Sequence, residues 1–187
     1  MTQQALALCR TAPSDPATID PAGRGRHGDS PDWDWIAAAP FRAHVRHVLT
    51  EEPLPWRAFA GHARVPDNVV RGLLGLGGRR LRRIAPHFAR ALIAIDAPSL
   101  RASLARPVPP DEMIIAARFL SRSGWPVAEV ARIGHLPEPR LGALLRGEEL
   151  FITHRSELLV TAAARAHGLD VTDSWAETFR DRSAAAA

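Results

Sequence analysis

Four arginines within five positions, Arg79, Arg80, Arg82 and Arg83, are the residues of this 187-residue chain that could most directly do chemistry. They follow the glycine-rich stretch GLGG at 75–78. Guanidinium groups bind phosphate oxygens, and glycines allow a loop to lie close to a phosphate backbone. The spacing therefore favours a phosphate-binding loop, and a merely solvated charged face is the competing interpretation.

The positive charge is confined to the same part of the chain. Residues 41–106 hold twelve arginines and four acids, a net charge of +8, whereas residues 1–40 and 107–187 each carry −2 and the whole chain +4. All 24 Lys+Arg positions are arginine, a bias associated with GC-rich genomes such as those of actinobacteria. A unit of this size with such an excess is expected to bind a polyanion.

Catalytic and metal-binding patterns are weak in comparison. His44 and His47 form HxxH without an acidic residue or a third ligand at a suitable spacing, so we expect a helix-surface or domain-interface role. Cys9 is the only cysteine, and no serine lies in a nucleophile-elbow context. GLGG lacks a preceding strand and the Lys-Ser/Thr of a nucleotide-binding loop. We predict no metal, no cofactor and no enzymatic activity.

The pattern of apolar residues predicts an all-α fold with two helical domains. Residues 1–30 and 181–187 are expected to be disordered tails, with domains at 31–97 and 111–180 joined by a proline-containing linker at 98–110. No apolar run approaches the roughly 20 residues of a membrane span, and no secretory signal is evident at the N-terminus. A cytoplasmic protein is expected.

The two domains are related by an internal repeat. LPWRAFAGHARVPDNVVRGLL aligns without a gap on WPVAEVARIGHLPEPRLGALL, 71 residues later. The offset pairs identical residues at five positions: Pro55 with Pro126, Ala60 with Ala131, Pro66 with Pro137, Leu73 with Leu144, and Leu74 with Leu145. Apolar positions also match, which favours duplication over chance.

Each copy has the form of a helix-turn-helix. In the first, Pro55 opens a helix, the residues 64–66 turn the chain, and a second helix follows; the expected buried positions are Phe59, Ala60, Ala63, Val70, Leu73 and Leu74. The second copy places its apolar residues equivalently, at Val130, Ala131, Leu136, Leu141, Leu144 and Leu145.

At these positions the chain resembles the helix-turn-helix family of the lambda repressor and Cro type, particularly small DNA-binding proteins of actinobacteria and their phages. The resemblance covers about 41–96 and, more weakly, 111–168. It includes the small residue in the first helix, the hydrophobic turn residue, the buried anchors of the recognition helix, and the exit LLRG at 144–147. The family's usual turn glycine is replaced by Arg64 and His135, which implies either a left-handed residue there or a different turn.

The resemblance implies a recognition helix whose outward residues read base edges. Asn pairs with adenine, Arg with guanine, and Asp accepts from cytosine, although Asp67 is equally suited to cap the helix. The expected base-reading residues are Pro66, Asp67, Asn68, Arg71 and, in the second copy, Arg140. The expected phosphate contacts are Arg57, Arg64, Arg79, Arg80, Arg82, Arg83 and Arg146.

The second copy differs where it would meet DNA. It has Glu148 and Glu149 where the first copy has glycines and arginines, so we expect a weaker second reader, with packing or partner binding as the alternative. The preferred interpretation is a sequence-specific regulator of transcription, a repressor, associated with the nucleoid. Its partner is double-stranded DNA, bound by one monomer at an asymmetric site, while dimerisation through 111–180 stays open. The alternative is a helical protein-interaction module, such as an anti-regulator or assembly factor.

Overall fold

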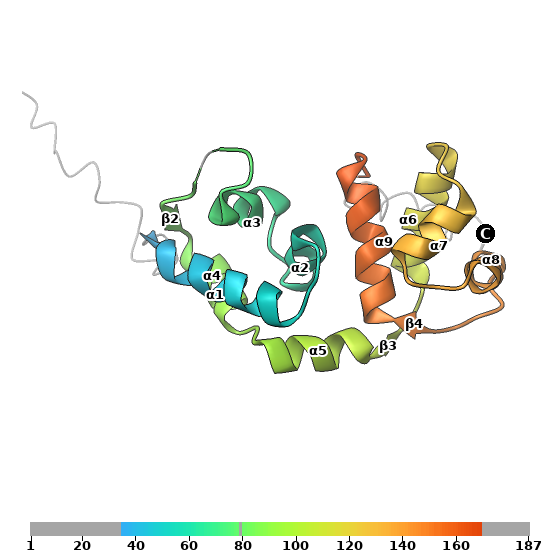
Figure 1. Cartoon of the computed structure of the whole chain (residues 1–187), viewed down its shortest axis with the longest axis horizontal. Coiled ribbons are helices and arrows are strands. Elements are labelled where there is room, and N and C mark those ends of the chain that lie inside the picture. The colour runs from blue at the N-terminus through green and yellow to red at the C-terminus, as the bar shows by residue number, and fades with distance from the viewer. Residues whose placement is uncertain (1–34, 79, 170–187) are drawn as a thin grey trace, which may run out of the picture.

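The computed structural model of this chain describes residues 35–78 and 80–169, so Arg79 and both predicted tails lie outside the described residues. This part contains nine α-helices and four strands of two residues each, which confirms the all-α class. None of its helices combines the length and the apolar character needed to cross a membrane. The helices form two lobes, seen side by side in Figure 1.

The first lobe begins with a short strand and ends with a helix that extends toward the second lobe. Its elements are β1 (Ile36–Ala37), α1 (Ala39–Glu51), α2 (Trp56–His62), α3 (Asp67–Leu74), β2 (Arg83–Ile84), α4 (Pro86–Ile93) and α5 (Ala97–Ala105). Pro55 and Pro66 directly precede α2 and α3, at positions whose missing amide costs no helical hydrogen bond. Five of the six predicted buried positions are confirmed, with Phe59, Val70 and Leu73 inaccessible to solvent. Leu74 is only partly buried and packs against the core from its edge.

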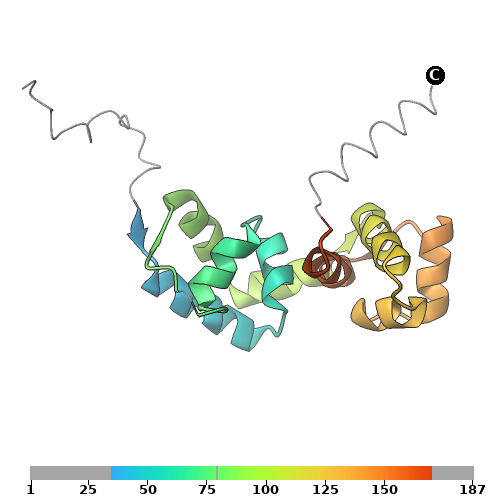
Figure 2. The ribbon, with the colours of Figure 1, turned by 90° about the horizontal axis from the view of Figure 1, so that it is seen from above.

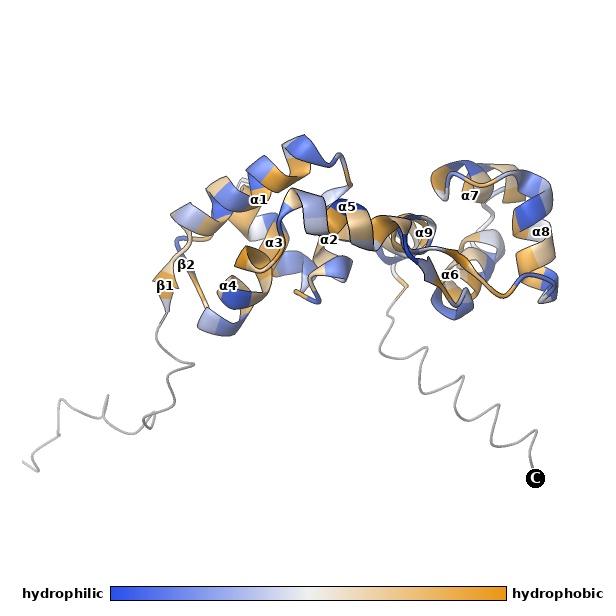
Figure 3. Cartoon of the chain, turned by 90° about the horizontal axis from the view of Figure 1, so that it is seen from below, coloured by the Kyte–Doolittle hydropathy of each residue, from blue (hydrophilic) through white to orange (hydrophobic). Residues whose placement is uncertain are grey.

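The second lobe repeats the same order of strand, three helices, strand and helix. Its elements are β3 (Pro107–Val108), α6 (Asp111–Arg122), α7 (Val127–Ile133), α8 (Glu138–Arg146), β4 (Ile152–Thr153) and α9 (His154–Ala166). In each lobe the two strands pair antiparallel, β1 with β2 and β3 with β4. These strands were not predicted, because two residues are too few to show an alternating pattern. Hydrophobic and hydrophilic residues alternate around the helices (Figure 3).

Helix α9 is shared by the hydrophobic cores of both lobes. Leu158, Leu159 and Ala162 belong to the core of the first lobe, whereas Val160 and Ala164 belong to the core of the second. These sets fall on different sides of one helix, as residues three or four apart share a face. Figures 1 and 2 show α9 between α2 and α6.

Helix α5 (Ala97–Ala105) covers the first half of the predicted linker at 98–110. Leu100 and Leu104 of α5 are buried in the first core, and the Asp96 carboxylate caps its start by accepting from the Ser99 amide at 2.7 Å. Because α5 also packs on α9, the connection between the lobes is a folded part of the molecule.

A buried carboxylate adds a polar contact between the lobes. Glu52, at the end of α1, accepts hydrogen bonds from Arg155 of α9 at 2.7 Å and from Arg101 of α5 at 2.9 Å. These two guanidinium groups, Arg155 foremost, lower the pKa of the Glu52 carboxyl against the opposing effect of burial. One acid thus ties α1, α5 and α9 together.

Candidate nucleic-acid interface

Helix α3 presents two polar side chains on its free face. Val70 and Leu73 are buried on one side, while Asn68 and Arg71, three residues apart, are both exposed on the other. Gly75 ends the helix in a left-handed conformation, with φ of 78°. Asn68 and Arg71, both predicted base-reading residues, are therefore presented on the same accessible surface.

The turn before α3 uses a residue with an unusual backbone. Arg64 has a positive φ of 52° and an exposed side chain, and Val65 beside it is buried. Of the two alternatives left by the missing turn glycine, the left-handed one is adopted. The turn leaves the exposed Pro66 and Arg64 next to the start of α3.

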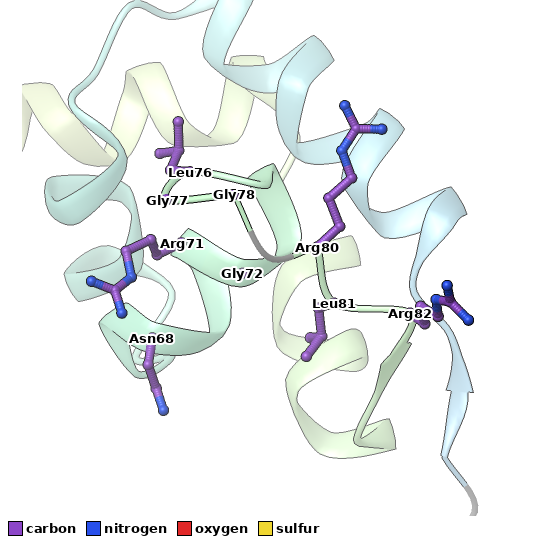
Figure 4. Close-up of a pocket in the computed structure, with 9 residues that line it drawn as sticks. All are labelled: Asn68, Arg71, Gly72, Leu76, Gly77, Gly78, Arg80, Leu81 and Arg82. Atoms are coloured by element: carbon purple, nitrogen blue, oxygen red, sulfur yellow. The ribbon is translucent and has the colours of Figure 1, made fainter.

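An open hollow of about 1060 Å³ lies between α3 and the loop that follows it. Asn68 and Arg71 line it from α3, and Arg80 and Arg82 line it from the loop. In Figure 4 the first two side chains project from the helix on one side, and the two loop arginines project on the other. The structure thus joins predicted base-reading and phosphate-binding residues in one basic surface, which we call the α3 groove.

Two arginines of α1 hold this surface in place. Arg42 donates from Nε to the Leu73 carbonyl at 2.6 Å and from Nη2 to the Leu81 carbonyl at 2.8 Å, and Arg46 donates to the Leu74 carbonyl at 3.2 Å. The last carbonyls of a helix lack intrahelical partners, and here the arginines of α1 donate hydrogen bonds to them. Because Arg42 also binds the carbonyl of Leu81, it connects the loop to the end of α3. Sequence reasoning missed this role, although the four-residue spacing on a helix was visible.

The remaining loop arginine of the described part is Arg83, in strand β2. It pairs in register with Ala37 of β1 and its side chain is exposed. Arg82, next to it, accepts through its carbonyl from the Ala38 amide at 3.0 Å. The basic loop is therefore anchored at both ends, by α3 and by the strand pair.

Asp67 is held in an ion-pair cluster at the start of α3. Its Oδ2 lies 3.5 Å from Nε of Arg57, and its Oδ1 lies 3.2 Å from Nη1 of Arg165 of α9. It makes no capping hydrogen bond, because Pro66 occupies the cap position without a side-chain cap. Asp67 and Arg57, predicted to contact bases and phosphate respectively, contact each other.

The predicted contacts of the second lobe are paired with acids. Nε of Arg140 on α8 lies 2.8 Å from Glu149, and Nε of Arg146 lies 2.6 Å from Glu148, a pair that also lowers the pKa of the Glu148 carboxyl. Both glutamates come from the loop after α8, the equivalent of the arginine loop in the first lobe. The same surface of the repeat is thus basic in the first lobe and neutralised in the second.

Histidines and acids also meet between the lobes, away from the α3 groove. His62 Nδ1 lies 3.3 Å from His154 Nε2, and His154 Nδ1 lies 2.9 Å from Glu157. Burial, and secondarily His154 and Arg106, lower the pKa of His62. Among the described residues no three His, Cys, Asp or Glu side chains are grouped to hold a metal ion. His44 of α1 instead donates to the carbonyl of Ile95, in the connection between α4 and α5, at 2.8 Å.

No protein-family model, no curated protein and no solved structure matches this chain. Its function must therefore be inferred from the geometry and charge of its own residues. The feature with the clearest chemistry is the α3 groove, where an amide, three guanidinium groups and a glycine-containing loop face solvent together.

Proposed function

We propose that this chain is a sequence-specific double-stranded DNA-binding regulator of transcription, and that α2, the turn at 63–66 and α3 form its helix-turn-helix. The observation that carries the proposal is the α3 groove. Asn68 and Arg71 are exposed on the short helix, next to exposed Arg80 and Arg82 on the loop. This combination places base-reading chemistry on one side of the groove and phosphate-binding charge on the other.

In the proposed complex α3 enters the major groove of DNA. An α-helix with its side chains is about 10–12 Å in diameter, which fits a major groove about 12 Å wide. The eight residues of α3 make it about 12 Å long. Asn68 can bind adenine through N6 and N7, and Arg71 can bind guanine through O6 and N7. Arg64, Arg80, Arg82 and Arg83 would contact phosphates and fix the register of α3 on the bases.

The second lobe is proposed to contribute less to DNA binding. Its two candidate arginines already have carboxylate partners, and breaking those pairs would reduce any gain from a phosphate. Helix α8 also lies at the far side of the second lobe from α3 in Figures 1 and 2. Repression is the expected outcome where the bound site overlaps a promoter, in keeping with the resemblance to the lambda repressor and Cro type.

A protein-interaction module is the second candidate, and one observation favours it. Leu150 and Phe151, in the loop after α8, are 72% and 57% exposed. Neighbouring exposed apolar residues are typical of a surface that binds another protein. Such a surface could serve a regulator as well as an assembly factor, so it does not by itself decide between the two.

Selection of bound fragments from a random DNA pool, followed by competition binding, tests the proposal. We expect one preferred site that out-competes random DNA by about a thousandfold or more at physiological salt. The double variant Leu150→Ser/Phe151→Ser serves as a control, because it removes the apolar residues and leaves the α3 groove intact. Equal binding of all DNA sequences by the unaltered protein would exclude a sequence-specific regulator.

A further inference from the structure

Arg165 belongs to α9, yet its guanidinium lies against the first two helices of the proposed reading unit. Nη2 donates to the Arg57 carbonyl at 2.7 Å, and Nη1 lies 3.2 Å from Asp67 Oδ1. Arg57 is in the first turn of α2 and Asp67 is the first residue of α3. One side chain of the second lobe therefore joins the starts of both helices.

The position of this guanidinium is closely defined by its surroundings. A Cβ atom at residue 61 would lie 2.7 Å from Nη2 of Arg165, so the glycine there leaves the space that the group fills. Its Nε is buried without a hydrogen-bond partner. Such an unpaired donor carries a cost in free energy, which the contacts to Arg57 and Asp67 must offset. The contact is specific to Gly61, Arg57 and Asp67.

The consequence for Asp67 is that each of its carboxylate oxygens lies next to a guanidinium group. Arg165 approaches Oδ1 and Arg57 approaches Oδ2. A free carboxylate at the start of α3 could accept a hydrogen bond from cytosine N4, and it would also repel the phosphate backbone. Pairing with two guanidinium groups prevents Asp67 from binding cytosine and reduces its repulsion of the phosphates. Asn68 and Arg71 are then the residues of α3 that read the bases.

We infer that Arg165 is a specificity-determining residue of the DNA site, acting from the second lobe by holding the Asp67 carboxylate away from the bases. This inference rests on the proposed function of the α3 groove. Arg165 is a positioning residue, because it acts through Asp67. It also gives the second lobe a part in DNA reading that does not depend on α8.

Site selection with variants of the full chain tests the inference. Arg165→Met should release Asp67, add a preference for cytosine at a base pair facing the start of α3, and weaken binding to the original site about tenfold. The matched control is Arg155→Met, which removes a guanidinium group from the same helix. Arg155 pairs with Glu52 and does not contact α3, so this variant loses an ion pair without changing the surroundings of Asp67. It should select the original site.

Asp67→Asn keeps the test decisive even if Arg165→Met folds poorly. Because the Asp67 carboxylate is already paired with Arg57 and Arg165, this variant should select the same bases as the unaltered protein. Added to Arg165→Met, it should restore the original preference. A changed preference in Asp67→Asn alone, or identical sites for Arg165→Met and Arg155→Met, would overturn the inference while leaving a DNA-binding protein. Absence of any preference in the unaltered protein would overturn the proposed function as well.

Discussion

Arg64 and His135 have the same left-handed backbone at equivalent turns, with φ of 52° and 53°. They stand 71 residues apart, which is the spacing of the sequence repeat. A left-handed conformation costs an L-residue roughly 1–2 kcal/mol, and glycine adopts it freely. Both copies therefore keep the same strained turn without the glycine that would relieve it.

Glycine at either position should stabilise the fold, but only one replacement should affect DNA binding. We expect Arg64→Gly and His135→Gly each to raise the free energy of unfolding by up to about 1 kcal/mol, as measured by urea denaturation. Arg64→Gly should also reduce the log–log salt slope of DNA binding by about 0.9, because one phosphate is no longer neutralised. A smaller slope in His135→Gly would contradict the assignment of the DNA face to the first lobe.

The arginines of the loop after α3 should contribute to DNA affinity but not to the preference for particular base sequences. Replacing Arg80, Arg82 and Arg83 with alanine, together with Arg79, should weaken binding to all DNA sequences alike and lower the salt slope by about 0.9 for each phosphate that is no longer neutralised. The matched control is Arg140→Ala with Arg146→Ala, whose guanidinium groups are paired with glutamates. Fluorescence anisotropy over a salt series measures both. An unchanged slope in the loop variant would identify these arginines as a solvated face.

Asn68 and Arg71 should determine which bases are preferred. Asn68→Ala or Arg71→Ala should cost about 1–3 kcal/mol on the preferred site and relax the preference at one or two adjacent base pairs. Thermal unfolding should be almost unchanged, since both side chains are exposed. Selected sites that match those of the unaltered protein base for base would show that α3 is not the reading helix.

One chain should occupy a non-palindromic site. The outward residues of α3 and α8 differ, and the α8 arginines are paired with acids, so the two units should bind with unequal strength. Native mass spectrometry of the complex, combined with footprinting, measures the stoichiometry and the symmetry. Two chains on a palindrome would instead assign dimerisation to the second lobe.

Acidification should weaken the contact between the lobes through His62. Its pKa is lowered in the folded state, so the unfolded chain binds more protons and stability falls as the pH drops below the ordinary value of 6.5. His62→Gln should flatten this dependence. Burial raises the pKa of the Glu112 carboxyl above its ordinary value of 4.5, which gives the opposite trend at pH values just above 4.5. Melting temperatures are therefore compared between the variant and the unaltered protein at the same pH, where the contribution of Glu112 is common to both.

The local parts of this fold could be predicted from the sequence because their signals are local. Prolines at 55, 66, 126 and 137 stand directly before helices, and the three- and four-residue spacing of Val70, Leu73 and Leu74 indicates a helix buried on one side. The equal spacing of the two copies identified equivalent turns. Exposure of Asn68 and Arg71 followed from the positions of their apolar neighbours.

The pairing of distant residues could not be predicted in the same way. Arg165 contacts Asp67 across 98 positions, and Arg155 contacts Glu52 across 103. The periodicity of a sequence does not indicate which acid will form an ion pair with a given arginine, because such pairing depends on how complete helices pack against one another. For the same reason a segment rich in prolines appeared to be a linker, although Leu100 and Leu104 of α5 are buried in the first core.

The sharing of α9 has a consequence for how this protein is made. Synthesis proceeds from the N-terminus, so α1 to α5 emerge before Leu158, Leu159 and Ala162, which complete their core, have been added. At about 5–20 residues per second, the roughly 60 residues between α5 and the end of α9 take on the order of 3–12 s. During that interval the apolar surface of α2 that α9 later covers is open to chaperones and to other nascent chains.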